Sequence, residues 1–144
     1  MVVIDAQDAV VGRLGARVAK LLMSGQAVEI INPDKALMRG SLSAAKEKYL
    51  SRRHQKDKRT PENSPHWPRS PHLLLRRMIR GMLPFGSSRR GRDAYHRLKV
   101  HAIAPEGVKA QRIAEAESGG QHGTFSISEL SESLGYHGRK PASE

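Results

Sequence analysis

Residues 2–31 of the chain, VVIDAQDAVVGRLGARVAKLLMSGQAVEII, decide its fold class. Two apolar runs, Val2–Ile4 and Ala27–Ile31, predict strands. Between them, apolar side chains recur at the spacing of one helix face, at Val10, Val11, Leu14, Val18, Leu21 and Leu22. Asp8 is placed to cap this helix and Gly25 to end it. A strand, a helix and a second strand within about 30 residues predict a βαβ unit.

Shorter elements and a long loop are expected downstream of this unit. A turn at 32–35 leads to a third short strand at 36–38, whose direction the sequence leaves open, and then to a helix at 42–54. Residues 55–69 hold three prolines and one large apolar residue, Trp67, and predict an extended loop. Long loops in compact domains are usually functional or disordered. Because this loop is basic, we expect it to become ordered on its partner.

The second half of the chain predicts further helices. Ser70 and Pro71 begin a helix that ends near residues 80–82. The Gly-, Ser- and Arg-rich stretch 86–92 predicts a flexible basic turn, followed by a short helix and a strand at 98–103.

The C-terminal part predicts one more helix after looser segments. Residues 107–117 are expected to form an exposed helix or a loose connection, and 119–123 a flexible break. Ser126 with Glu129 forms a capping box, and Phe125 with Leu130 the matching hydrophobic staple, for a helix that stops at Gly135. We expect residues 1–137 to form a single domain and 138–144 to be a disordered tail.

The positive charge is concentrated in one central segment. The chain has 25 Lys and Arg against 14 Asp and Glu, a formal net charge of +11. Residues 46–99 hold sixteen basic and four acidic residues, a net charge of +12, so the remainder carries −1. A net charge alone fits any soluble basic protein, but a charge confined to one segment indicates a surface for a polyanion such as nucleic acid.

The composition excludes several classes of protein. The chain has no cysteine, which excludes disulfides, thiol catalysis and cysteine-ligated zinc. Nothing approaches the ~18 consecutive apolar residues of a membrane span. The first residues show neither the charged nor the apolar region of a signal peptide.

The candidate contacts to nucleic acid lie in the basic segment, because Lys and Arg bind phosphate through charge and Arg adds a planar, bidentate fork. They are Lys46, Arg52, Arg53, Lys56, Lys58, Arg59, Arg69, Arg76, Arg77, Arg80, Arg89, Arg90, Arg92 and Lys99. Trp67 is either a platform for a stacked base or an anchor that packs the loop onto the domain, and the sequence leaves both open. A stripe of Arg13, Arg17 and Lys20 is either a solvated helix face or a secondary contact.

Signatures of catalysis and of metal binding are absent from the sequence. Residues 11–15, VGRLG, lack the first glycine of the dinucleotide fingerprint, and there is no P-loop or nucleophile elbow. His54, His66 and His72 match no common metal-site spacing. Two alternatives to a non-catalytic RNA-binding protein are an RNA-modifying enzyme, which would need a cofactor loop or a catalytic acid, and a DNA-binding or chromatin protein, which would prefer duplex DNA.

Several stretches resemble a known family. Arg80-Gly81-Met82-Leu83-Pro84 is followed by the Arg90-Gly91-Arg92 turn and by Leu98-Lys99-Val100. With Val3-Ile4-Asp5, Val11-Gly12-Arg13-Leu14, Arg39-Gly40-Ser41, Lys48-Tyr49-Leu50 and Pro65-His66-Trp67, these stretches resemble large-ribosomal-subunit protein thirteen in its archaeal and eukaryotic form. The resemblance covers nearly the whole chain, although the spacer from Phe85 to Arg90 is a residue longer than is usual in that family.

This resemblance implies both a fold and a role. The fold is α/β, a three-layer α/β/α domain with a small, mainly parallel four-stranded sheet and basic loop extensions. The role is that of a structural constituent of the large ribosomal subunit in the cytoplasm, which binds large-subunit rRNA and supports subunit assembly beside neighbouring ribosomal proteins. The resemblance implies no catalysis, cofactor, small-molecule substrate or membrane. The charge distribution independently supports only the binding of RNA or another polyanion.

Overall fold

The computed structural model describes residues 1–105, 110–117 and 123–138. Strand β1 (Val2–Asp5), helix α1 (Val11–Met23) and strand β2 (Val28–Ile31) form the predicted βαβ unit. The two strands are parallel, with Val2 opposite Val28 and Ile4 opposite Ile30. The predicted apolar face of α1 is buried at Val11, Leu14, Val18 and Leu22. The periodicity of the sequence therefore placed this unit correctly.

The two ends of α1 differ in how they are held. Gly25 follows the helix with a φ of 96°, which confirms its predicted role as terminator. The prediction of Asp8 as N-cap is wrong, because Val10 is the N-cap residue and no side chain caps the helix. Asp8 lies in a preceding turn with a φ of 58°, where its N–H donates to the Lys35 carbonyl (3.3 Å). Tertiary hydrogen bonds, rather than a local cap, hold the entry to α1.

Four strands form a parallel sheet in the order β4-β2-β1-β5. Strand β4 is Leu98–Val100 and ends before the predicted residue 103. Strand β5 is Gln111–Arg112, in a segment predicted as an exposed helix or a loose connection. Both of its side chains are exposed and it pairs with β1 through the backbone, so no apolar pattern indicates it. The predicted α/β class with a small, mainly parallel four-stranded sheet is confirmed.

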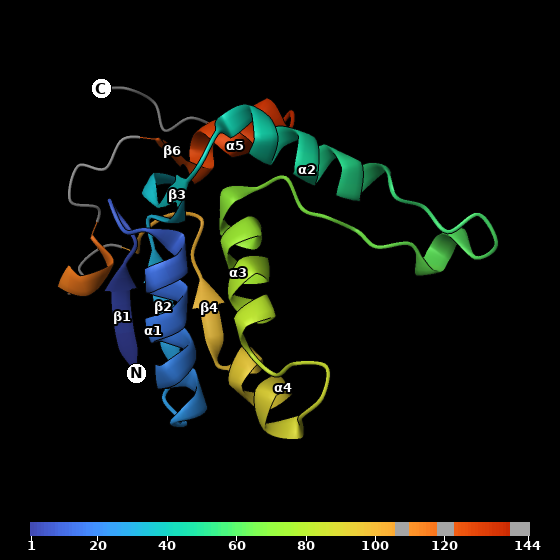
Figure 1. Cartoon of the computed structure of the whole chain (residues 1–144). Coiled ribbons are helices and arrows are strands. Elements are labelled where there is room, and N and C mark those ends of the chain that lie inside the picture. The colour runs from blue at the N-terminus through green and yellow to red at the C-terminus, as the bar shows by residue number, and fades with distance from the viewer. Residues whose placement is uncertain (106–109, 118–122, 139–144) are drawn as a thin grey trace.

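Helices α1 and α3 (Pro71–Met82) lie side by side on one face of this sheet (Figure 1). The strand residues Ile30 and Leu98 are buried beneath them. Helix α3 adds buried Leu74, Leu75 and Ile79. The core therefore sits between the sheet and the helix pair, and the arginines of α3 remain outside it.

The opposite face of the sheet carries charged side chains, since successive residues of a strand point to alternate faces. Glu29 pairs with Lys99 (3.4 Å) and with His101 (3.1 Å), and Asp5 pairs with Arg112 (3.4 Å). The hydrogen bond to His101 is the main cause that lowers the pKa of Glu29. Burial alone would raise the pKa of Asp5. Hydrogen bonds from the Asn32 side-chain amide and the Gln7 N–H, together with the charge of Arg112, hold this pKa below its usual value.

A two-stranded sheet and two helices lie at one end of this core (Figure 1). Strand β3 (Leu37–Arg39) pairs antiparallel with β6 (Thr124–Ser126), which settles the direction that the sequence left open. Helices α2 (Leu42–His54) and α5 (Ile127–Ser133) follow these strands and pack on each other. The Ser126 hydroxyl accepts a hydrogen bond from the Glu129 N–H (3.2 Å), so the predicted N-cap is confirmed.

Residues 55–69, named the arm from here on, project from the body between α2 and α3 (Figure 1). The arm is extended as predicted and holds one short 3₁₀ helix, η2 (Pro61–Asn63). Two further 3₁₀ turns, η1 (Pro33–Lys35) and η3 (Ala114–Ala116), lie in connections of the body. The arm therefore carries its charges away from the core.

The basic stretch predicted as a flexible turn is largely helical. Helix α4 (Arg89–His96) begins inside it, with the Arg92 N–H donating to the Ser88 carbonyl (3.2 Å). Gly91 is buried, and a Cβ on it would lie 2.2 Å from the Pro84 carbonyl oxygen. Close packing of backbone against backbone, rather than flexibility, explains this glycine.

Two predicted segments lie largely outside the described residues: the flexible break at 119–123, except Gly123, and the tail at 138–144, except Gly138. Across the described part of the chain, every helix is too short or too polar to span a bilayer.

Candidate nucleic-acid interface

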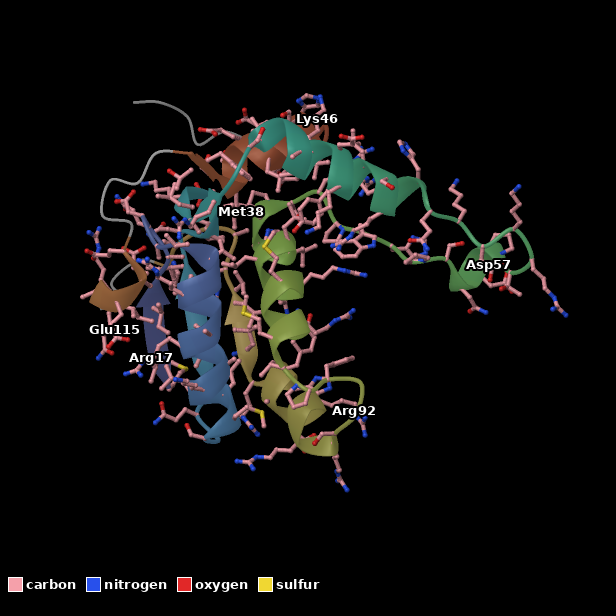
Figure 2. The ribbon with its side chains drawn as sticks, viewed as in Figure 1. Arg17, Met38, Lys46, Asp57, Arg92 and Glu115 are labelled. Carbon is pink, nitrogen blue, oxygen red and sulfur yellow. The ribbon has the colours of Figure 1, made fainter. Side chains whose placement is uncertain are left out.

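Most of the predicted cationic residues belong to α2, the arm, α3 and α4, which follow one another along one side of the molecule (Figure 1). Figure 2 shows Lys46 on α2, Asp57 near the tip of the arm and Arg92 on α4. The exposed members are Lys46, Lys56, Lys58, Arg59, Arg69, Arg89, Arg90 and Arg92. The half-buried members are Arg52, Arg53, Arg76, Arg77 and Arg80. This set is termed the cationic surface.

Trp67 joins the arm to the helices on either side of it. Its ring meets that of Tyr49 edge-on, with centroids 5.9 Å apart. The guanidinium groups of Arg52 and Arg77 stack on the indole at 4.8 and 3.9 Å from its centroid. The Trp67 carbonyl accepts a hydrogen bond from Arg53. These five residues form what we term the Trp67 clasp, and they favour the anchor among the two roles that the sequence left open.

The tip of the arm is closed by its own hydrogen bonds. The Asp57 carboxylate accepts from the Arg59 N–H (2.9 Å) and from the Thr60 hydroxyl (2.9 Å). The Asp57 N–H donates to the Ser64 hydroxyl (3.0 Å) across the base of the turn. The hydrogen bond from the Arg59 backbone is the main cause that lowers the pKa of Asp57. The carboxylate is thus used inside the turn, while Lys58 and Arg59 point their charges to solvent.

A second group of stacked arginines lies where α3 meets α4. Arg76 stacks on Tyr95 at 4.8 Å and Arg80 on Phe85 at 5.0 Å from the ring centroids. The two rings pack edge-on with centroids 5.2 Å apart. The Arg76 Nε is buried without a hydrogen-bond partner among the described residues. Stacking on a ring face holds a guanidinium in place and leaves its N–H edge available to an anion.

Three basic residues have partners within the protein. Arg90 donates to the Met23 carbonyl (2.8 Å). Arg97, which was not among the predicted contacts, donates to the Leu22 carbonyl (3.0 Å). These bonds satisfy carbonyls at the C-terminal end of α1, where a positive charge is favourable. Lys99 pairs with Glu29 on the sheet face opposite α1 and α3, so the structure does not bring it together with the other predicted contacts.

Ion pairs among the described residues do not neutralise the charge of the cationic surface. In residues 1–105, 110–117 and 123–138, no carboxylate lies within ion-pair distance of an arginine of α2, α3 or α4. Burial, followed by the charges of Arg80 and Arg52, lowers the pKa of Arg77. Arginine nevertheless stays charged at neutral pH. Cations that repel one another in this way favour a bound polyanion.

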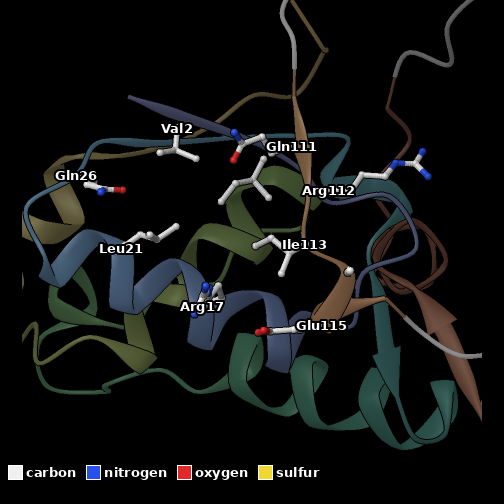
Figure 3. Close-up of a pocket in the computed structure, with 10 residues that line it drawn as sticks. Val2, Arg17, Leu21, Gln26, Gln111, Arg112, Ile113 and Glu115 are labelled. Atoms are coloured by element: carbon white, nitrogen blue, oxygen red, sulfur yellow. The ribbon is translucent and has the colours of Figure 1, made fainter.

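A cavity of about 430 Å³ lies elsewhere on the molecule, between α1 and the β5 edge (Figure 3). Arg17 and Glu115 are among its lining residues. Over the described ranges, no cluster of three His, Cys, Asp or Glu side chains could hold a metal ion. The cavity therefore offers no metal-based chemistry from those residues, and the cationic surface is the better candidate site.

Comparison with known proteins shows to which family this chain belongs. The profile described as ribosomal protein L13 matches residues 1–106, which include α2, the arm, α3 and α4. The chain belongs to the ribosomal protein L13 family. The match confirms the resemblance noted in the sequence.

Archaeal members of the L13 family align over most of the chain. Large ribosomal subunit protein uL13 of Methanopyrus kandleri is 38% identical over 141 residues, which cover 93% of this chain and 86% of the relative. The protein of the same name from Methanococcus maripaludis is 42% identical over 109 residues, or 75% of this chain and 79% of the relative. That of Archaeoglobus fulgidus is 37% identical over 115 residues, or 80% and 71%. These relatives are structural ribosomal proteins, so the prediction of a non-catalytic chain is confirmed.

Sequence reasoning missed the aromatic partners of the arginines in this L13-family chain. Tyr49, Phe85 and Tyr95 were not among the predicted site residues, although each contacts an arginine or the Trp67 ring. A signal existed, because four of the six aromatic residues lie within the basic segment 46–99. Which arginine meets which ring depends on contacts between α2, α3 and α4, which no local pattern encodes.

Proposed function

We propose that the chain is a structural constituent of the large ribosomal subunit, which binds large-subunit rRNA and supports subunit assembly in the cytoplasm beside neighbouring ribosomal proteins. The relatives' name, large ribosomal subunit protein, supports the location. The observation that carries the RNA-binding part is the cationic surface, whose arginines lack carboxylate partners within the described residues.

The chemistry of binding follows from the two kinds of cation on this surface. Exposed lysines and arginines of the arm, such as Lys58 and Arg59, suit long-range attraction to phosphates. Arginines that contact ring faces, such as Arg76 and Arg80, suit bidentate contacts to phosphate oxygens. Contacts to phosphate position a protein on RNA and carry no sequence information by themselves. We therefore expect shape, rather than base sequence, to dominate recognition.

The test is equilibrium binding of the full chain to a labelled transcript of archaeal large-subunit rRNA between 50 and 200 mM salt. If ~6–10 phosphates are neutralised, affinity should fall steeply between these two salt concentrations. The fall is about 10³–10⁵-fold for duplex DNA and smaller for single strands, and we expect folded rRNA to lie in that general range. Affinity that does not change with salt would overturn the proposal.

A matched pair of variants separates this surface from general charge. Arg80→Gln should weaken binding, since it removes a phosphate-binding group that stacks on Phe85. It should also reduce the slope of log affinity against log salt concentration by about one. Lys35→Gln removes one exposed charge outside the basic segment and should have a much smaller effect. Equal losses in the two variants would show that only net charge matters. Retention of the chain on large subunits through a moderate salt wash is the complementary test, and recovery only in the free cytosolic fraction would refute the proposal.

A further inference from the structure

We propose that Trp67 is a positioning residue that holds the arm in its binding conformation before RNA arrives, so that Lys56, Lys58 and Arg59 meet phosphates from a preformed element. The inference rests on the proposed rRNA binding and names how one part of that surface works. It replaces the expectation from composition that the loop becomes ordered only on its partner.

The first observation concerns the returning half of the arm, which is tied to three separate elements. The His66 carbonyl accepts a hydrogen bond from Arg77 of α3 (2.8 Å). The Trp67 carbonyl accepts one from Arg53 of α2, and the Arg69 carbonyl accepts one from the hydroxyl of Ser131 of α5. Three carbonyls within four residues are thus held by side chains from different helices, so the path of the backbone at this point is determined by the body.

The second observation is that other side chains of the protein already contact the Trp67 ring. Two guanidinium groups stack on it and the Tyr49 ring meets it edge-on, and Tyr49 is itself buried. A base that stacked on this indole would compete with the guanidinium groups of Arg52 and Arg77. The geometry therefore assigns Trp67 to the support of the arm and leaves contact with RNA to the cations.

The third observation is the closure of the tip. Asp57 accepts hydrogen bonds from the backbone and side chain that follow it, and its own N–H reaches Ser64 seven residues later. Of the three exposed cations, Lys56 lies between the clasp and this turn, and Lys58 and Arg59 lie within the turn. Both ends of the cationic segment are therefore restrained. An element ordered in advance loses less conformational entropy on binding than a free loop.

Fluorescence tests the clasp without RNA, because Trp67 is the only tryptophan of the chain. In the free full-length protein, the indole should be shielded from acrylamide, and addition of the rRNA transcript should leave its emission nearly unchanged. An indole that is open to acrylamide in the free protein and becomes quenched on RNA binding would identify a stacked base instead and would overturn the inference.

Binding measurements test the consequence for RNA. Trp67→Ala changes no charge. It should nevertheless reduce the slope of log affinity against log salt concentration by about two to three, which is the contribution of the three arm cations. Replacing Lys56, Lys58 and Arg59 by alanine should cost much affinity in the parent chain and little more in the Trp67→Ala background. Losses that simply add would show that the arm cations act independently of the clasp. Trp67→Phe, which keeps a ring, should recover part of the affinity.

Two further variants protect this test against misfolding. Leu73→Ala removes an exposed apolar side chain of α3 outside the clasp and should leave binding unchanged. Asp57→Ala opens the tip without touching the core and makes the chain more positive. Simple electrostatics predicts tighter binding by this variant, whereas a preformed arm predicts weaker binding. Tighter binding by Asp57→Ala would contradict the inference even if Trp67→Ala failed to fold.

The outcomes separate the two proposals. A parent chain that does not bind the rRNA transcript would refute the proposed function and leave the fluorescence result to decide on the clasp. A parent chain that binds with normal salt dependence, beside a Trp67→Ala variant that binds equally well, would refute only the inference about the arm.

Discussion

Replacing Gly91 by alanine should destabilise the protein, whereas the same replacement at Gly81 should not. Both glycines lie in helices, Gly91 in α4 and Gly81 in α3. A Cβ at residue 91 would lie 2.2 Å from the Pro84 carbonyl oxygen and 2.5 Å from its carbon, whereas nothing lies within 4 Å of a Cβ at residue 81. One chemical change thus meets two opposite environments.

The magnitude follows from three contributions. The atoms of Pro84 that oppose the new methyl group belong to the backbone, so they cannot rotate away, and overpacking of this kind costs about 1–3 kcal/mol. Displacing that carbonyl also weakens the bond it accepts from the Ser88 N–H (3.1 Å), a bond worth about 0.5–1.5 kcal/mol. The better helix propensity of alanine offsets about 0.5–1 kcal/mol. We expect a net loss of about 0.5–4 kcal/mol for Gly91→Ala, centred near about 2 kcal/mol, and a gain of up to about 1 kcal/mol for Gly81→Ala.

Urea unfolding followed by circular dichroism measures both variants, with the slope of the transition checked for constancy. Thermal unfolding should agree, at about 2–4 °C for each kcal/mol in a chain of this size. A Gly91→Ala variant as stable as the parent, or equal shifts in the two variants, would refute the argument that close packing requires this glycine. It would also return residues 86–92 to the status of a flexible turn.

Further predictions concern a cap, a carboxylate and a second close contact. Ser126→Ala should lower the free energy of unfolding by about 0.5–2 kcal/mol because its hydroxyl caps α5, whereas Ser70→Ala, at an N-cap position where no side-chain cap forms, should change it little in the same urea assay. The depressed pKa of Asp5 contributes stability above the unfolded-state pKa of about 4, and this contribution should be lost as the pH falls through the lower folded value. Unfolding measured from pH 6 downward should show a smaller acid-induced loss in Asp5→Asn, and an unchanged loss would contradict the assignment. Gly15→Ala should cost less than the alanine variant in α4, because the nearest atom to its Cβ is the movable sulfur of Met82 (2.5 Å), and a cost equal to or larger than that one would show that Met82 cannot move.

Elements with a strong local signal were predicted closely. The apolar periodicity of residues 2–31 predicted β1, α1 and β2, and the pair Ser70 and Pro71 predicted the start of α3. Strand β5 was missed, and the short helix predicted after residue 92 begins earlier than expected, as α4 at Arg89. Strand β5 consists of two exposed residues that pair with β1 through the backbone, and α4 begins in a run of small and basic residues that is typical of turns.

The candidate site shows the same division. The concentration of arginines in α2, α3 and α4 was visible from charge alone, because charge is a property of composition and position in the chain. Lys99 looked equivalent to the others in sequence, but it pairs with Glu29 on the far face of the sheet. Arg90 likewise donates a hydrogen bond to the Met23 carbonyl of α1, so one of its N–H groups is already occupied within the protein.

The sequence by itself determined the α/β class, the first βαβ unit and the segment that carries the excess positive charge, since periodicity and composition act over a few residues. Only the tertiary structure decided the antiparallel pairing of β3 with β6, the need for glycine at residue 91 and the anchoring of the arm by Trp67. Each of these depends on contacts between residues distant in the chain, from Arg53 to Trp67 and from Leu37 to Ser126. Packing selects such contacts from many that the local sequence would permit equally well.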